Sequence, residues 1–350
     1  MTYTKLQRKP KQFQAFTGVT PAQFAEILEA LHPVYAEFEK ERLSRPNRKR
    51  KIGGGRSFNL SLENRLLVTL MYFRLYVSFA LLGYMFDLDG TNIGREIHQR
   101  MLPALLSILP VPMQDELLSG HNEPPQIGGG KRIKTLKKLM EAHPEIKEVW
   151  VDATEQPTQR PHEKLARRQY YSGKHSQHTI KSQLLTTKKL ILHVSGNLPG
   201  SVHDSTVLAG SGSMHSIPAD VQVNLDRGYE GAEKRYPNNK VYKPKRAQRN
   251  HPLTLFEKLY NHIINKTRIL VEHVIGRVKK FRIVSDTLSQ STGISWRLLP
   301  RRNWLDQFQD FERSRLGIAL NIACSDCIYL ATYLLCRRFC ISSYKTPGRV

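Results

Sequence analysis

The sequence predicts an α/β protein in which a mixed sheet flanked by helices follows an all-helical N-terminal domain. The first 110 residues carry only helix-type spacing of apolar residues, residues 147–247 alternate short β-type runs with one helical segment, and the longest proline-free helical pattern follows them. The resulting order of strand, strand, strand, helix, strand, strand and long helix is typical of a mixed sheet covered by helices. We place a linker at residues 111–146, the α/β domain at 147–283 and a helical tail of uncertain role at 284–350.

The composition indicates a polyanionic partner. Lys and Arg number 54 against 30 Asp and Glu, which gives a net charge of +24, and the cations are spread over both halves of the chain. Nucleic acid fits this charge better than a membrane, because the best amphipathic helix is too apolar to lie on a membrane surface and no signal-like N-terminal segment is seen. We therefore expect a cytoplasmic protein, associated with the nucleoid if its source is prokaryotic.

The C-terminal tail contains one long apolar run, Leu316–Cys336. A buried helix explains it better than a membrane span, because Asn321 and Asp326 lie inside it and a central Asp opposes membrane insertion. The same region holds all four cysteines. Their arrangement in one helix-like run favours small core residues over a zinc site, and no disulfide framework is implied: Cys324, Cys327, Cys336 and Cys340.

The N-terminal part begins with a predicted helix at Pro21–Arg42, and a second helix is expected at Ser61–Leu75 with Ser61 as its N-cap. Between them, the segment Arg42–Arg56 combines many cations with three consecutive glycines, which suits DNA phosphates or a minor groove. An ordinary solvated basic loop is the alternative. The candidate DNA contacts in this basic arm are Arg48, Lys49, Arg50 and Lys51.

Residues 77–105 are typical of a helix-turn-helix. Two helical stretches, 77–86 and 91–105, flank a DLDG turn in which Gly90 would permit the turn and Thr91 would cap the second helix. An ordinary helical packing unit has the same appearance, but the adjacent basic arm favours DNA binding. The second helix carries a polar face for base edges and phosphates, with Asn92, Arg95 and Gln99 as the candidate contacts beside Glu96 and Arg100.

The α/β domain opens with a strand that ends near Asp152, followed by a β-hairpin over 178–200 and a short helix at 203–211. Another strand ends at Asp226, and a last short strand precedes the long helix Leu253–Ile283. On that helix, one apolar stripe is expected to be buried: Phe256, Leu259, Ile263, Thr267, Leu270, Val274, Val278 and Phe281, widened by Ile264, Val271 and Ile275.

Glu272 lies at the edge of this stripe, with Arg268 and Lys279 nearby on the helix surface. Taken alone, these charges are explained by a solvated face with an i,i+4 ion pair between Arg268 and Glu272. The predicted topology changes that interpretation, because it brings Asp152 and Asp226 side by side and the helix adds Glu272. Three converging carboxylates repel one another unless a hard divalent cation neutralises them. Each acid alone could equally be a cap or turn residue.

Five sequence blocks, in order, resemble insertion-sequence transposases of the Asp-Asp-Glu (DDE) superfamily, in the branch related to Harbinger-type elements: VDATEQP, YYSGKHSQHTIK, LPGSVHDS, LDRGYEG and RILVEHVIGRVKKFRI. Arg268, Glu272 and Lys279 match the spacing of Arg, Glu and Lys in the signature of that group. The stretch IGGGRSFNLSLENRLLVTLMYFRLY and the helix-turn-helix after it resemble the N-terminal DNA-binding module of the same family.

This resemblance implies a ribonuclease-H-like catalytic fold and a metal-dependent DNA endonuclease and strand transferase acting on terminal inverted repeats and target DNA. It implies Asp152, Asp226 and Glu272 as catalytic residues and ligands of two Mg²⁺ ions, with Mn²⁺ as a substitute. By position, Arg268 and Lys279 are expected to contact DNA near the cleaved end. Lys174, His178 and Lys181 are further candidates for phosphates, with paired-strand surface as their alternative, while His203 and Asp204 are not expected to be catalytic.

Two functions from different classes remain at this point. One is an active transposase, which the presence of all three acids favours. The other is a catalytically inactive, transposase-derived protein that binds specific DNA sequences. An unrelated metal-dependent nuclease is a third option, against which the additional helix-turn-helix counts. The sequence leaves open a homodimer, the terminal-repeat sequence and the target preference.

Overall fold

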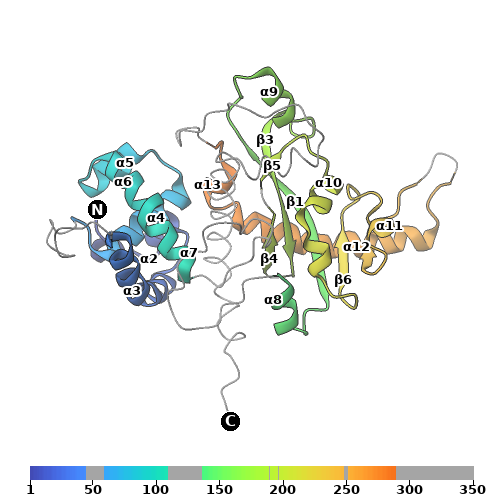
Figure 1. The fold of residues 1–350 in the computed structure, drawn as a ribbon, viewed down its shortest axis with the longest axis horizontal. Helices are drawn as coiled ribbons and strands as arrows, with labels where there is room; N and C mark the ends of the chain where they lie inside the picture. Colours follow the sequence, from blue (N-terminus) through green and yellow to red (C-terminus); the bar gives the residue numbers. More distant parts are fainter. Residues whose placement is uncertain (45–58, 109–135, 189, 196, 248–250, 289–350) are drawn as a thin grey trace, which may run out of the picture.

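The computed structural model describes residues 1–44, 59–108, 136–188, 190–195, 197–247 and 251–288 (Figure 1). The N-terminal part is helical, as predicted, and its helices are α1 Tyr3–Leu6, α2 Pro10–Thr17, α3 Pro21–Leu43, α4 Leu62–Leu75, α5 Phe79–Phe86, α6 Gly90–Arg95 and α7 Leu102–Ile108, with a π-helix, η1 Glu96–Met101, between α6 and α7. A capping box starts α3, because Thr20 and Gln23 bond to each other's backbone amides. None of the described helices is long and apolar enough to cross a membrane, and Leu316–Cys336 lies outside the described residues.

The helix-turn-helix consists of α5 and the continuous helical stretch from α6 through η1 to α7. The turn differs from the prediction in two residues. Asp87 takes the left-handed conformation with φ of 57°, and the Asp89 side chain, not Thr91, caps α6 by accepting from the Thr91 amide at 2.8 Å. Gly90 is needed for close packing instead, since a Cβ there would lie 3.1 Å from the Ala80 backbone.

A mixed sheet forms the second part of the molecule. Its strands are β1 Glu148–Pro157, β2 Tyr171–Ser172, β3 Gln177–Thr186, β4 Ile191–Val194, β5 Leu198–Pro199, β6 Gln222–Leu225 and β7 Lys240–Tyr242. β3 pairs antiparallel with both β1 and β4, whereas β1 to β6 and β6 to β7 are parallel. Three antiparallel strands continued by two parallel ones confirm the predicted ribonuclease-H-like α/β fold, and the predicted hairpin is β3 with β4.

The shorter helices of this part are α8 Leu136–Ala142, α9 Lys164–Tyr170, α10 Asp204–Ser211 and α11 Ala232–Arg235, with a 3₁₀ turn, η3, at Ser213–Ser216. One apolar cluster lies under α8, α10 and α11, and it includes Val149, Leu185, Val223 and Tyr229, all nearly or fully buried. These alternate strand positions face inward, as expected for a sheet covered on that side.

The long helix is α12, Leu255–Val278, which starts with a capping box between Thr254 and Glu257. The predicted burial of its apolar stripe is correct for Val271, Val274 and Val278 in the C-terminal half and for Ile264 in the N-terminal half. The prediction is wrong for Phe256, Leu259 and Ile263 in the N-terminal half, which are exposed, and for Leu270 further along. The reason in the N-terminal half is that it extends beyond the strands of the sheet (Figure 1).

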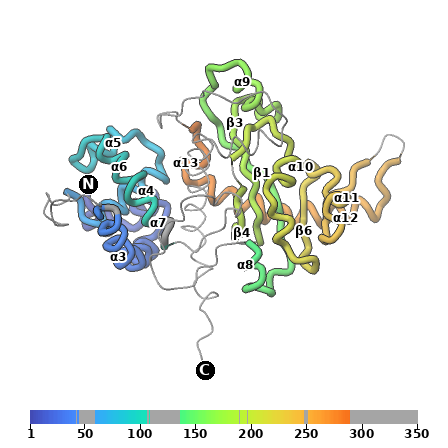
Figure 2. The backbone as a smooth tube through the Cα atoms, in the orientation of Figure 1, coloured from blue at the N-terminus to red at the C-terminus, as the bar shows by residue number. Residues whose placement is uncertain are grey.

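The two parts of the chain meet where α12 ends. A short helix, α13 Arg282–Ser285, lies between the N-terminal helices and the sheet and contacts α4 (Figure 2). Phe281 is fully buried there, against Gly18, whose φ is +81°. The Arg74 guanidinium bonds the Lys280 and Ala15 carbonyl oxygens. A single apolar cluster therefore runs from the N-terminal helices through the end of α12 to the sheet.

Candidate active site

The predicted acids come from β1, from the residue after β6, and from α12. Asp152 follows Val151, the last β1 residue paired with β6, and Asp226 follows the Val151 partner Leu225. The two aspartates therefore leave neighbouring parallel strands at the same level. The sequence interpretation placed Asp152 at a strand end, but β1 continues to Pro157 along β3 alone.

All three acids line one cleft of about 280 Å³. Asp152 and Asp226 line it from the sheet side, and Glu272 lines it from α12 with a side chain that is 59% exposed. Glu155 and Asp204 also line this cleft, as do the cations Lys174 and Lys279. The cleft thus combines several carboxylates with cations that come from separate elements.

The environment of Asp152 shifts the pKa of its carboxyl. Burial raises the pKa of its carboxyl above the ordinary value of 3.8, and the nearby charge of Asp226 acts in the same direction. Arg268 and Lys174 oppose that rise, as does the hydrogen bond from the Ala153 amide at 2.8 Å. A buried carboxylate beside a second carboxylate gains stability from any cation that enters the cleft.

Asp226 already has a cationic partner. Its Oδ1 accepts from Arg268 Nη1 and from the Arg227 backbone amide, both at 2.6 Å. The other nitrogen, Nη2, lies 4.0 Å from Glu272 Oε1. Within the part of the chain that the structure describes, no group of three or more His, Cys, Asp or Glu is arranged to hold a metal ion. The roles of Asp152, Asp226 and Glu272 as ligands therefore stay predictions.

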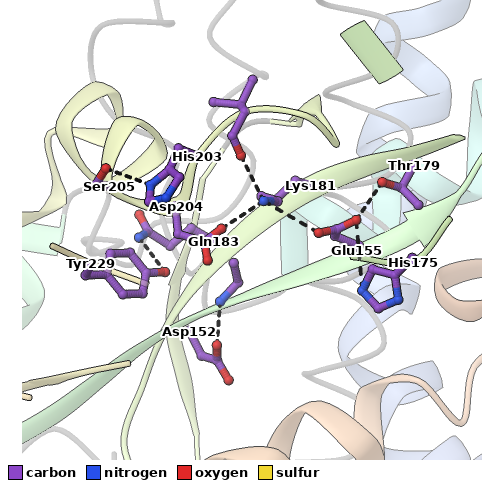
Figure 3. A network of polar contacts seen from close by, with 12 residues as sticks. Asp152, Glu155, His175, Thr179, Lys181, Gln183, His203, Asp204, Ser205 and Tyr229 are labelled. Carbon is purple, nitrogen blue, oxygen red and sulfur yellow. Dashed lines mark hydrogen bonds and ion pairs between the residues drawn. The ribbon is translucent and has the colours of Figure 1, made fainter. Parts of the chain in front are cut away.

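A second charged network lies beside these acids, centred on the buried ammonium of Lys181 (Figure 3). Lys181 Nζ donates to Asp204 Oδ1 and to the Val202 carbonyl oxygen, each at 2.8 Å, and lies 3.5 Å from Glu155 Oε1. The prediction that Lys181 meets phosphates is therefore wrong in this structure, because its charge is buried against two carboxylates. A lysine in an otherwise buried strand needs carboxylate partners. The apolar sequence around Lys181 could therefore have indicated a buried ion pair instead of a phosphate contact.

Glu155 and Asp204 are two further acids of this cleft, and the sequence analysis did not expect Asp204 to be catalytic. Thr179 donates to Glu155 Oε2 at 2.7 Å, and a Cβ on Gly228 would lie 2.9 Å from Asp204 Oδ2. Glu155 therefore ties β1 to β3, while Asp204 ties α10 to β3 through Lys181 and lies close against Gly228. Both side chains line the cleft, so substitutions of Glu155 or Asp204 would not serve as controls for substitutions of the three predicted ligands.

Of the other predicted contacts, Lys174 is exposed at the cleft and His178 is half-buried in β3. Lys279 is partly buried in the cleft, its Nζ is 3.4 Å from the Glu155 carbonyl oxygen, and burial lowers the pKa of its ammonium. The nearby carboxylates Glu155 and Asp152 oppose this lowering. Lys174 and Lys279 therefore place positive charge at this cleft, and their contact with DNA stays a prediction.

In the N-terminal part, the predicted contacts Asn92, Arg95 and Gln99 are all exposed on the helix formed by α6 and η1. Glu96, which the prediction placed on the same polar face, is buried in an ion-pair network with Arg65 and Arg100. That network fixes the helix against α4, so Glu96 and Arg100 position the polar face. The basic-arm residues Arg48, Lys49, Arg50 and Lys51 lie outside the described residues.

Comparisons with known proteins match both parts of the chain. Residues 151–303 match the family model described as DDE superfamily endonuclease, and residues 58–105 match the helix-turn-helix of DDE superfamily endonuclease. A curated relative, the probable transposase for insertion sequence element IS702 of Microchaete diplosiphon, is 25% identical over 281 residues, which are 80% of this chain and 87% of that protein.

Two solved structures also match. One is a piggyBac transposase synaptic complex with hairpin DNA, at 10% identity and a TM-score of 0.34, covering 97% of this chain and 86% of that one. The other is a pre-cleavage Mos1 transpososome, at 8% identity and a TM-score of 0.18, covering 84% and 85%. These TM-scores are too low to support a structural argument, so the family rests on the sequence matches.

Proposed function

We propose that this chain, as a member of the DDE superfamily of endonucleases, is a transposase. It binds the terminal inverted repeats of its element and catalyses metal-dependent DNA cleavage and strand transfer. The observation that carries the proposal is the cleft in which Asp152, Asp226 and Glu272 come together from β1, the end of β6 and α12. The helix-turn-helix with its exposed polar residues supports the DNA-binding half of the proposal.

The donor set of the cleft fits a hard divalent cation. Its acids offer only oxygen atoms, which is the ligand type that Mg²⁺ and Mn²⁺ prefer. The raised pKa of Asp152 supports this fit, because a buried carboxylate beside Asp226 is stabilised by added positive charge. The chemistry that two such ions supply when bound is activation of a water molecule and stabilisation of the leaving oxygen of a phosphodiester.

The residues of the chain supply the positioning. Asp152, Asp226 and Glu272 are the proposed ligands of Mg²⁺, with Mn²⁺ as a substitute, and Lys174 and Lys279 orient the phosphates at the cleft. Asn92, Arg95 and Gln99 read the terminal repeat, while the basic arm holds the duplex by its phosphates. The same cleft then serves hydrolysis at the element end and the attack of the freed 3′ hydroxyl on target DNA.

In this scheme residues 1–110 recognise DNA, residues 111–146 form a linker and residues 147–283 carry out the chemistry. The protein would act on DNA of the nucleoid, as a transposase of the Harbinger-related branch. A homodimer would bring two element ends together. Residues 284–350 receive no task in this scheme.

The test is cleavage of a terminal-repeat duplex in Mg²⁺ by three variants, Asp152→Asn, Asp226→Asn and Glu272→Gln. Each should lose at least about 100-fold in rate while still binding the duplex, since even residues behind metal ligands contribute about 10–100-fold. Matched controls are Asp220→Asn and Glu230→Gln, whose partners Lys147 and Arg246 are on the surface. Wild-type binding without any cleavage would support the inactive DNA-binding protein instead, and unchanged cleavage by the three variants would refute the site.

A further inference from the structure

Arg268 is placed among all three proposed ligands. Its Nη1 donates to Asp226 Oδ1 at 2.6 Å, and its Nη2 lies 4.0 Å from Glu272 Oε1. Its charge also lowers the pKa of Asp152, against the effect of burial. One guanidinium therefore supplies positive charge to the three carboxylates that the proposed function gives to a divalent cation.

The contacts of Arg268 are incomplete for an arginine among carboxylates. Its Nε is buried and has no hydrogen-bond partner among the described residues, and each carboxylate has only one guanidinium nitrogen near it. A two-bond Arg–carboxylate pair would satisfy the planar fork better. The ion pair is also one-third exposed at Arg268, so solvent and ligands can reach it. Such a contact neutralises the acids and can still be exchanged.

A divalent cation at Asp226 would compete with this contact. It would take electron density from the same carboxylate and would repel the guanidinium, and salt screens this repulsion only weakly because the groups are close and partly buried. Arg268 would then need another anion. A DNA phosphate is the anion that fits, because Lys174 and Lys279 give the cleft positive charge and because Arg binds phosphates with the same planar fork.

We propose that Arg268 is an internal counter-ion that holds Asp226 and Glu272 until DNA arrives, so that DNA and the divalent cation bind cooperatively. This inference rests on the proposed function of the same site. A phosphate that draws Arg268 away frees Asp226 for the cation, and a cation at Asp226 frees Arg268 for the phosphate. By linkage, each ligand must raise the affinity for the other by the same factor.

The test measures the affinity of Mn²⁺ by calorimetry, with and without a terminal-repeat duplex that already ends at the cleaved position and so offers no bond to cut. Wild type, Arg268→Ala and Arg268→Lys are compared. Without DNA, Arg268→Ala should bind Mn²⁺ at least about five-fold more tightly than wild type, the lower end of typical coupling. DNA should tighten Mn²⁺ binding by at least about five-fold in wild type and by less than about two-fold in Arg268→Ala.

Arg268→Lys should lie between the other two, because lysine keeps the charge and lacks the fork. Arg246→Ala is the matched control, since Arg246 forms an exposed ion pair with Glu230, and it should behave as wild type. Equal Mn²⁺ affinity in wild type and Arg268→Ala, with binding lost in Asp226→Asn, would overturn the counter-ion role alone. Mn²⁺ binding that survives both Asp152→Asn and Asp226→Asn would overturn the proposed metal site itself.

Discussion

At the scale of single residues, Asp152 combines two demands that conflict in the metal-free protein. Its position beside Asp226 is what a cation site requires, yet burial there disfavours its charge and raises the pKa of the carboxyl. The unfolded chain releases this proton near the ordinary value of 3.8, and the folded chain releases it at higher pH. The stability of the metal-free protein must therefore fall as the pH rises from 3.8 through the raised pKa.

We predict that Asp152→Asn removes this dependence. In a chelator at pH 8, the variant should melt above the wild type by roughly 2 °C or more, the shift that about 1 kcal/mol gives in a domain of this size. At pH 3 the two should melt together, because Asp152 is then neutral in both states. Thermal melting followed by circular dichroism gives the comparison, and a difference of equal size at both pH values would refute the electrostatic cause.

Sequence reasoning could name candidate site residues that lie in distinctive sequence blocks. It could not assign residues such as Lys181, whose role depends on the side chains that contact it in the folded protein. Asp152, Asp226 and Glu272 could be named because their sequence blocks are distinctive and the predicted topology placed them near one another, although β1 continues past Asp152 to Pro157. Lys181 was assigned to phosphates because the sequence of β3 does not show that Glu155 and Asp204 meet its ammonium. Such pairing depends on strand register and on the α10 loop, which no local pattern specifies.

At the scale of elements, α12 shows what periodicity can and cannot establish. The apolar spacing predicted the helix correctly, because helical periodicity is local, while the capping box between Thr254 and Glu257 at its start was not predicted. The spacing could not show where the partner surface ends. The C-terminal half of α12 lies on the described core through Val271, Val274 and Val278, while the N-terminal half continues past the sheet and buries only Ile264 of its predicted stripe.

This division predicts unequal effects of substitution along one helix. Val274→Ala should destabilise the protein by about 1–3 kcal/mol, because a buried apolar side chain leaves a cavity. Phe256→Ser should change the free energy of unfolding by less than about 0.5 kcal/mol, because Phe256 is 86% exposed. Urea unfolding of both variants makes the comparison. A larger loss for Phe256→Ser than for Val274→Ala would show that the N-terminal half of α12 is covered in solution.

At the scale of the whole molecule, the charge of +24 is the dominant property. Cations lie on the helix-turn-helix at Arg95 and at the cleft at Lys174 and Lys279, so both parts of the chain carry exposed positive charge. The Arg74 and Phe281 contacts join these parts where α12 ends. The sequence indicated the two parts and their order, but this joint depends on a backbone conformation at Gly18 that could not be read from it.

The basic arm gives the prediction at this scale. Binding of any duplex should weaken steeply with salt, since each phosphate neutralised contributes about −0.9 to the slope of log affinity against log salt concentration. Replacing Arg48, Lys49, Arg50 and Lys51 by Ala should flatten that slope by about 2–4. Fluorescence anisotropy over a salt series measures it. An unchanged slope would remove the arm from the DNA interface.

The most direct test of the metal-dependent site replaces one ligand by a softer one. Asp152→Cys exchanges a carboxylate for a thiolate, which Mg²⁺ binds poorly and Mn²⁺ accepts better. Cleavage of a terminal-repeat duplex should fall at least about 100-fold in Mg²⁺ and recover substantially in Mn²⁺, while Asp220→Cys cuts as the wild type does in both. Cleavage by Asp152→Cys at the wild-type rate in Mg²⁺ would contradict the assignment of Asp152 as a metal ligand.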